Sequence, residues 1–258
     1  MTRFDRRALF ASGAAAALLA ATGVSASPAR GGRLRAALSP DWFDRAVTAT
    51  LFDSLTEIAA DGTLRGELAT GWRSDRDARV WTFDLREGVQ FHDGTTFGPR
   101  DVVRLPFDVQ ISGAHQVAIH LDVPDPNLPY RLAQPGYELR SETGAGTGLY
   151  RVRKLETGRH FVGARFDAHW KRDAGWFEMV DFVQIGAEIV RFQALAEGLV
   201  DVADGAQPGD AITDDTFVAL PNADAPTHFA NRKVTAPMTV GKVWPLDNLR
   251  MAERWWTA

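Results

Sequence analysis

The sequence predicts an α/β fold in which helices flank a mixed β-sheet. Residues 81–85 alternate apolar and polar side chains, which is the period-two pattern of a half-buried strand. Residues 188–197 have the spacing of an amphipathic helix, and Gly198 follows as its stop. A compact apolar strand precedes this helix at 182–185, and another follows it at 199–202. Such alternation of strands and helices is typical of the α/β class.

Length and composition limit the possible functions. A chain of 258 residues with 45% hydrophobic content can bury a sizeable core in one large domain or two small ones. The formal net charge of −4 gives no indication of a general affinity for nucleic acid, so we expect no nucleic-acid partner. The chain has no cysteine, which excludes disulfides, thiol chemistry, cysteine-based zinc sites and a lipid-modified cysteine.

The N-terminus, residues 1–29, is interpreted as an export signal peptide. Three arginines lie within the first seven residues, residues 8–24 are almost wholly small or apolar, and residues 24–26 offer small side chains for cleavage. Interruptions by serine and glycine make a retained membrane anchor the weaker interpretation. Arg6 and Arg7, followed by Ala-Leu-Phe, also resemble a twin-arginine signal. We therefore expect a soluble protein exported to the periplasm.

The next elements alternate between strand and helix. Residues 33–38 read as a first strand, which Ser-Pro-Asp-Trp at 39–42 breaks. Residues 44–56 then show helical spacing of apolar side chains. Beyond the strand at 81–85, a turn and a return strand at 89–92 are expected, and Pro99 suits the first position of a short helix.

His92 and Asp93 could form a catalytic or metal-binding pair. The alternative is that both close a turn through local hydrogen bonds, as Asp commonly does before Gly. The second interpretation is preferred because no further histidine or carboxylate cluster follows at ligand spacing.

The phrase WTFDLREGVQFHDGT at residues 81–95, followed by an acidic helix start, closely resembles a segment of the family 5 extracytoplasmic solute-binding proteins, the peptide- and nickel-binding receptors of ABC importers. Four shorter phrases are similar to that family: 51–55, 68–72, 146–150 with Leu149 in place of a proline, and 166–170. The resemblance implies a class II periplasmic-binding-protein-like lobe with a mixed sheet flanked by helices.

The chain also departs from the family pattern. Pro106 ends the helix that the relatives extend, and alternating residues at 107–111 and 117–121 predict a hairpin instead. An accessory subdomain is therefore expected to be missing. The glycine-rich run 144–150 could cradle phosphate, but residues 150–153 look like a strand rather than the helix that such a loop needs.

The lobe is assigned to residues 33–204, and residues 205–258 to a linker and a short C-terminal segment. Residues 217–222 predict a short strand followed by a loop to Lys242. Asp247 can cap a last helix whose apolar face would pack back on the lobe through Leu249, Ala252, Trp255 and Trp256. Most of a second lobe is expected to be absent.

The sequence carries no catalytic signature, so no enzymatic activity is expected. It lacks a G-x-S-x-G elbow, an H-E-x-x-H pair and a cysteine nucleophile. His115 and His120 are an odd number of residues apart on the expected hairpin, which places them on opposite faces and disfavours a metal site. No catalytic residue, metal or cofactor is expected.

Two functions that are not enzymatic remain open. The resemblance implies a monomeric periplasmic receptor that binds a peptide or other small solute non-covalently and delivers it to an ABC importer permease. The alternative is a truncated single-lobe remnant that acts as a protein-interaction module without high-affinity ligand binding, because a solute held on one lobe stays half exposed.

The ligand-binding residues are taken from family positions that face the cleft between two lobes. They are Ser39, Trp42 and Phe43 after the first strand, and Thr147 and Gly148 in the glycine-rich turn. The competing interpretation for Trp42 and Phe43 is that both cover the core.

Overall fold

The computed structural model describes residues 31–59, 62–172, 174–175, 177–206, 217–222 and 225–231. The expected signal peptide at 1–29 and the expected C-terminal helix after Asp247 lie outside the described residues. No helix in the described ranges is long and apolar enough to cross a membrane.

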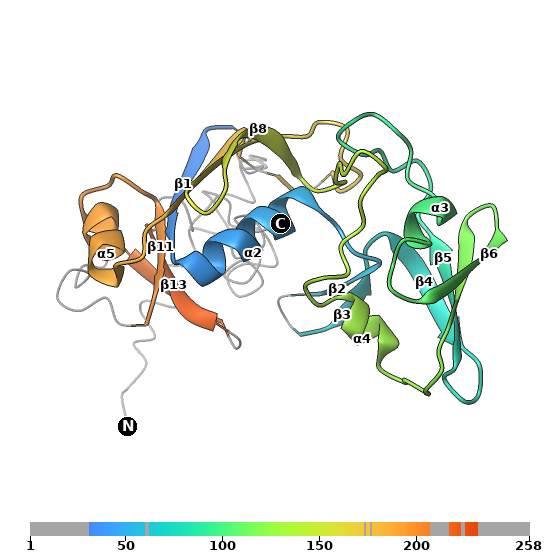
Figure 1. Cartoon of the computed structure of the whole chain (residues 1–258). Helices are drawn as coiled ribbons and strands as arrows, with labels where there is room; N and C mark the ends of the chain where they lie inside the picture. Colours follow the sequence, from blue (N-terminus) through green and yellow to red (C-terminus); the bar gives the residue numbers. More distant parts are fainter. Residues whose placement is uncertain are drawn as a thin grey trace, which may run out of the picture.

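A seven-stranded mixed sheet forms the larger of two bodies (Figure 1). Its central strand β1 pairs in parallel with β10 and β11, and the remaining neighbours are antiparallel. In spatial order the strands are β12 (Phe217–Asn222), β13 (Ala225–Asn231), β11 (Val202–Gly205), β1 (Arg33–Leu38), β10 (Met179–Gln184), β9 (His160–Arg165) and β8 (Tyr150–Glu156). We call this sheet and its helices the large body.

Two helices cover opposite faces of the large sheet. Helix α2 (Pro40–Leu51) packs on the strand residues that share a face with Leu34 and Leu38, whereas α5 (Glu188–Ala196) packs in the cluster of Ala37. Because successive strand residues point to opposite faces, the two helices lie on either side of β1. The mixed sheet flanked by helices that the sequence predicts is confirmed.

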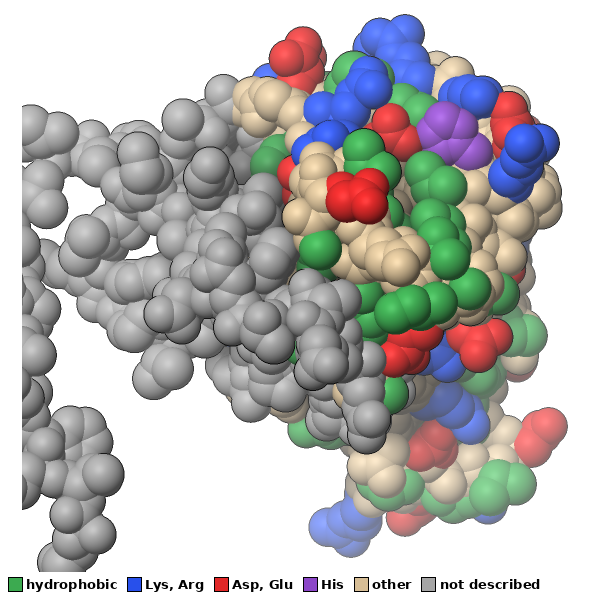
Figure 2. Space-filling model, turned by 90° about the vertical axis from the view of Figure 1, so that its left-hand side faces the viewer, with side chains coloured by type: hydrophobic (Ala, Val, Ile, Leu, Met, Phe, Trp, Pro, Cys, Tyr) green, Lys and Arg blue, Asp and Glu red, His purple; other side chains and the backbone are tan. Residues whose placement is uncertain are grey.

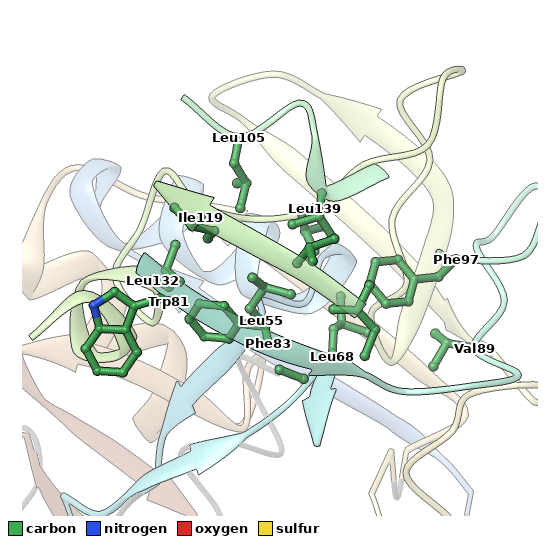
Figure 3. Packing of buried hydrophobic residues seen from close by; sticks show 14 of the residues in the cluster. Leu55, Leu68, Trp81, Phe83, Val89, Phe97, Leu105, Ile119, Leu132 and Leu139 are labelled. Atoms are coloured by element: carbon green, nitrogen blue, oxygen red, sulfur yellow. The ribbon is translucent and has the colours of Figure 1, made fainter. Parts of the chain in front are cut away.

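The small body comprises a four-stranded antiparallel sheet, a two-stranded sheet and two short helices. Its elements are β2 (Thr56–Ile58), β3 (Leu64–Gly66), β4 (Ala69–Ser74), β5 (Val80–Leu85), α3 (Pro99–Val102), β6 (Asp108–Gly113), β7 (Gln116–His120) and α4 (Leu128–Leu132). The inward faces of β5 and β7 carry Phe83 and Ile119, which pack with Leu55 and Leu68 in a core of the small body's own (Figure 3).

Three predicted elements differ in the structure. Helix α2 begins at Pro40 rather than at residue 44, because proline fits the first helical turn and Asp41 favours its positive end, and it ends at Leu51 rather than at residue 56. Residues 89–92 form no strand: Gln90 makes only an isolated bridge to Thr96. Strand β5 pairs instead with β4 and β7, so the expected hairpin at this point is wrong, although the hairpin β6–β7 is confirmed.

Two further corrections concern the end of the described chain. Residues 225–231 form β13 where a loop was expected, and β11 begins at Val202 rather than at residue 199. Ile189 of α5 was expected on the apolar buried face but is 58% exposed, while Arg191 is 4% exposed.

On the side of the molecule that Figure 2 shows, hydrophobic side chains form a band among charged ones over the described residues.

Candidate functional site

The carboxyl ends of β1 and β10 form a topological switch point. The chain leaves β1 for α2 on one face of the sheet and leaves β10 for α5 on the other face. The two strands stay paired to their ends, where the Ile185 backbone N–H donates to the Leu38 carbonyl at 2.8 Å. Open α/β sheets bind ligands in the crevice that such diverging connections leave. The predicted ligand residues Ser39 and Trp42 lie at this edge.

A buried ion pair fixes Ser39 at the switch point. Asp204, at 0% exposure, accepts the Ser39 backbone N–H at 2.8 Å and also the Ser39 hydroxyl. The guanidinium Nε of Arg191 lies 2.9 Å from Oδ1 of Asp204. Arg191 also donates to the carbonyls of Ile185 and Gly186. It is therefore bonded both to the connection between β10 and α5 and, through Asp204, to the connection between β1 and α2. Asp204 and Arg191 were not identified as site residues from the sequence; the available signal was a charged residue within the apolar face of a helix.

A cleft of about 560 Å³ runs along α2 between the large and small bodies. The α2 side of its wall carries Trp42, Ala46, Ala49 and Phe52. The opposite wall is the segment from Ala133 to Arg140 that follows α4. A volume of this size lies within the range of small-molecule sites.

Each aromatic ring of the cleft is covered by a guanidinium. The Arg45 guanidinium lies 5.4 Å from the centroid of the Trp42 ring, and that of Arg140 lies 3.8 Å from the centroid of Phe52. Both distances are those of cation–π contacts. The cleft therefore combines apolar surface with two oriented cations.

Two buried carboxylates share one ammonium group at the inner end of the cleft. Lys171 Nζ lies 2.8 Å from Oε2 of Glu57 and 2.6 Å from Oε1 of Glu67. The other carboxylate oxygen of Glu67 accepts the Ser54 backbone N–H at 3.0 Å. Burial raises the pKa of Glu67 to about 8, against the opposing charge of Lys171. This cluster joins the segment after β9 to the small body.

Asp53 contacts side chains from two distant segments of the chain. Its Oδ2 accepts the Thr147 hydroxyl at 3.0 Å and the Trp170 indole N–H at 3.2 Å, and His169 Nε2 lies 3.5 Å away. His169 Nδ1 accepts the Lys171 backbone N–H, which leaves Nε2 facing Asp53. Burial alone would raise the pKa of Asp53, but the His169 contact and the Lys171 charge lower it below its usual range.

The glycine-rich run serves close packing rather than phosphate binding. A Cβ on Gly148 would lie 2.5 Å from the carbonyl carbon of Leu51, and one on Gly146 would overlap the Leu51 carbonyl oxygen. His92 ties this run to the small body, with Nε2 2.7 Å from the Gly148 carbonyl oxygen. Strand β8 follows the run, as predicted.

The expected turn at Asp93 is confirmed, but the local hydrogen bond expected of His92 is wrong, because its side chain contacts the distant Gly148 carbonyl instead. Its carboxylate accepts the backbone N–H and the hydroxyl of Thr95 at 2.9 Å and 2.6 Å. Among the described residues, no three His, Asp or Glu side chains gather in a way that could hold a metal ion. The two hairpin histidines are separated, with His115 at 3.8 Å from Glu87 and His120 at the end of β7.

The five residues predicted to bind ligand lie in different surroundings. Phe43 is 1% exposed and belongs to the core of the large body, and Thr147 is 0% exposed beside Asp53. Ser39 is bound to Asp204, and Gly148 packs against the end of α2. Trp42 is partly exposed and lines the cleft. Contact between these residues and a ligand stays a prediction.

Known solved structures share this architecture. The chain matches a peptide-binding protein of Helicobacter pylori, DppA in complex with the peptide STSA, at 16% identity with a TM-score of 0.66, covering 74% of this chain and 51% of that one. It matches a Pseudoalteromonas dipeptide-binding protein in complex with Met-Leu at 18% identity and a TM-score of 0.65, covering 73% and 50%. These likenesses establish a periplasmic-binding-protein-like fold.

Curated relatives are longer than this chain. The "Probable D,D-dipeptide-binding periplasmic protein DdpA" of Escherichia coli K12 is 23% identical over 207 residues, which cover 65% of this chain and 40% of the relative. "Di/tripeptide-binding protein 3" of Pseudomonas aeruginosa UCBPP-PA14 is 30% identical over 121 residues, 44% of this chain and 20% of the relative. The chain thus spans less than half the length of either relative.

The family model for bacterial extracellular solute-binding proteins, family 5, matches residues 63–232, which is more than half of the chain. The match runs from the small body into the large one and includes the cleft wall that follows α4, whereas the α2 wall precedes the matched residues. The relatives described above are named as binding proteins, not as enzymes. This chain belongs to the family 5 bacterial extracellular solute-binding proteins.

Proposed function

We propose that this protein is the periplasmic solute-binding component of an ABC importer, which binds a peptide or another small solute non-covalently and delivers it to the permease. The observation that carries the proposal is the family 5 match across residues 63–232. The names of two curated relatives, both peptide-binding proteins, favour a peptide-like solute.

The geometry supports solute binding at the meeting of the switch point and the cleft. Trp42 follows the end of β1 and also lines the cleft along α2, so one aromatic ring belongs to both features. A partly exposed tryptophan offers a large apolar surface to a ligand at little entropic cost. Direct contact is therefore assigned to Trp42 and to the segment that begins at Ser39. A structural role without direct ligand contact is assigned to Phe43, Thr147 and Gly148.

The domain organisation and the route to the periplasm are also proposals. Residues 1–29 are proposed to be a cleaved export signal, possessing the twin-arginine pair Arg6 and Arg7. The lobe spans 33–204, and the described strands at 217–222 and 225–231 extend its sheet. Mass spectrometry of the protein from its own host should find a mature start near Ser27 or Arg30; a start at Met1 or Thr2 would contradict the export proposal.

A thermal-shift screen tests the proposed function. The mature protein is heated with dipeptides, oligopeptides, nickel and small solutes that contain a carboxylate. A ligand at one hundred times its dissociation constant stabilises the fold by about 2.7 kcal/mol, which is easily detected. The interaction-module alternative, which the family match does not favour, requires that no compound shifts the transition while a partner protein binds.

A further inference from the structure

We infer that the cleft along α2 binds the carboxylate group of a small solute through the guanidinium group of Arg45 or that of Arg140, which stand at opposite ends of the α2 wall. This inference rests on the proposed function and gives the solute a chemical class. The walls of the site come from this chain, on α2 and on the segment after α4, so the site needs no second lobe.

The two guanidinium groups contact aromatic rings. Neither Arg45 nor Arg140 forms an ion pair with a carboxylate in the described part of the chain, where several other arginines, including Arg35 and Arg191, do. A guanidinium that stacks its face on a ring keeps the N–H donors at its edge available. These donors match the two oxygens of a carboxylate, and the ring contact orients them in advance.

The α2 wall of the cleft has small side chains between two large aromatic ones. Ala46 and Ala49 lie between Trp42 and Phe52, which are ten residues apart and therefore separated by about 15 Å along the helix. Small side chains between two large rings leave a depression with an apolar floor. A guanidinium stands at each ring, so a solute with an apolar body can place its carboxylate at either end.

The carboxylates of the same cleft would repel an anion if their charges were uncompensated. Glu57 and Glu67 share the ammonium of Lys171, and Asp53 accepts hydrogen bonds from Thr147 and Trp170. Glu138 accepts the Gly136 backbone N–H at 2.9 Å. Asp44 is exposed to solvent, which screens its charge. The acidic groups at the inner end are thus engaged within the protein, and the two guanidiniums remain for a ligand.

The test compares a dipeptide with its uncharged counterpart by isothermal titration calorimetry. Wild-type protein is titrated with L-alanyl-L-phenylalanine and with the same dipeptide as its C-terminal amide. We expect the amide to bind at least tenfold more weakly, because it lacks the negative charge that strengthens hydrogen bonds from a guanidinium group. Equal affinity for the two peptides would overturn the inference without any variant.

Variants then place the effect in the cleft. The double variant Arg45→Gln, Arg140→Gln should lose at least tenfold in affinity for the free acid and should no longer discriminate against the amide. Arg153→Gln, on the exposed outer strand β8, is the matched control and should bind like wild type. Unchanged binding by the double variant would overturn the inference alone. Failure of both peptides to bind wild type would also overturn it, and failure of the whole solute panel would overturn the proposed function as well.

Discussion

The ammonium group of Lys171 bridges Glu57 and Glu67 and so connects the segment after β9 to the small body. The three groups are largely buried, and both N–O distances are 2.8 Å or less. The cleft begins where this bridge closes the space between the two bodies, because Glu57 and Glu67 are among the residues that line it. The bridge therefore ties the two glutamates that line the cleft to the segment after β9 of the large body.

Replacing Lys171 with Met should destabilise the protein by about 3–5 kcal/mol at pH 9, above the pKa of Glu67, because it leaves the largely buried carboxylates of Glu57 and Glu67 without their counter-charge. The free energy of unfolding is measured by urea denaturation. Lys154→Met is the matched control: Lys154 pairs with Glu156 on the exposed surface of β8 and should cost no more than about 1 kcal/mol. Equal effects of the two substitutions would show that the buried bridge contributes little.

Stability should fall as the pH rises from about 5 to 8. The pKa of Glu67 is raised from 4.5 to about 8 in the folded protein, so the folded state holds a proton that the unfolded state releases. The stabilisation is complete below the unfolded pKa and is lost as the pH rises through the folded pKa. Glu67→Gln should flatten this dependence in urea titrations at pH 5, 6, 7 and 8. Parallel curves for wild type and variant would contradict the assignment.

Asp53 acts in a separate range of pH. Its pKa lies below the ordinary value of 3.8, so its stabilising contribution is present above that value and is lost as the pH falls through the folded pKa. The variant Asp53→Asn should therefore remove part of the acid sensitivity below about pH 4. Because the charge of Asp53 also helps to raise the pKa of Glu67, the variant should in addition weaken the slope between pH 5 and 8. An unchanged acid sensitivity would contradict the role of Asp53.

Gly148→Ala should destabilise the fold by about 1–3 kcal/mol or more, because the new methyl group would press on the backbone at the end of α2. Gly186→Ala is the matched control, since a Cβ there has no neighbour within 4 Å and its backbone has no positive φ. Thermal denaturation compares the two variants. A Gly148→Ala protein as stable as the control would mean that the glycine-rich run is not needed for this contact.

Trp42 and Phe43 are adjacent in sequence but should respond differently to truncation. Phe43→Ala removes a core side chain and should cost about 3–5 kcal/mol of folding free energy. Trp42→Ala should keep the fold, with a loss below about 2 kcal/mol, and weaken solute binding at least tenfold. Both are measured by urea denaturation and titration calorimetry. Loss of fold on truncating Trp42, with no separable binding defect, would assign that ring to the core.

Most elements of the large body could be predicted from local pattern, although β13 was expected to be a loop. The strand at Arg33–Leu38, the β8–β9 hairpin and the order β10, α5, β11 each have periodic apolar residues bounded by glycine or proline. In the small body, β5 was recognised but its partner was not. Its period-two pattern fixes which face is buried, and does not say that β7, more than thirty residues away, supplies the neighbouring strand.

The candidate site was less accessible from sequence for the same reason. Trp42 was identified, while Arg140 comes from a segment nearly one hundred residues away and meets Phe52 only in the folded chain. Arg191 occupies a position on α5 that looks apolar by spacing, and only the buried Asp204 explains why a charge is stable there. Pairings between distant segments determine both features.

The proposal that this protein binds a small solute is tested most simply by measuring binding to the wild-type chain. Wild-type protein is titrated with L-alanyl-L-phenylalanine in a calorimeter, and its unfolding transition is recorded with and without saturating peptide. We expect saturable binding with one site per chain. The free energy of unfolding should rise by about 2.7 kcal/mol when the peptide concentration is one hundred times its dissociation constant. Absence of heat together with an unmoved transition, for this dipeptide and for the rest of the solute panel, would contradict the claim that this chain is a solute-binding protein.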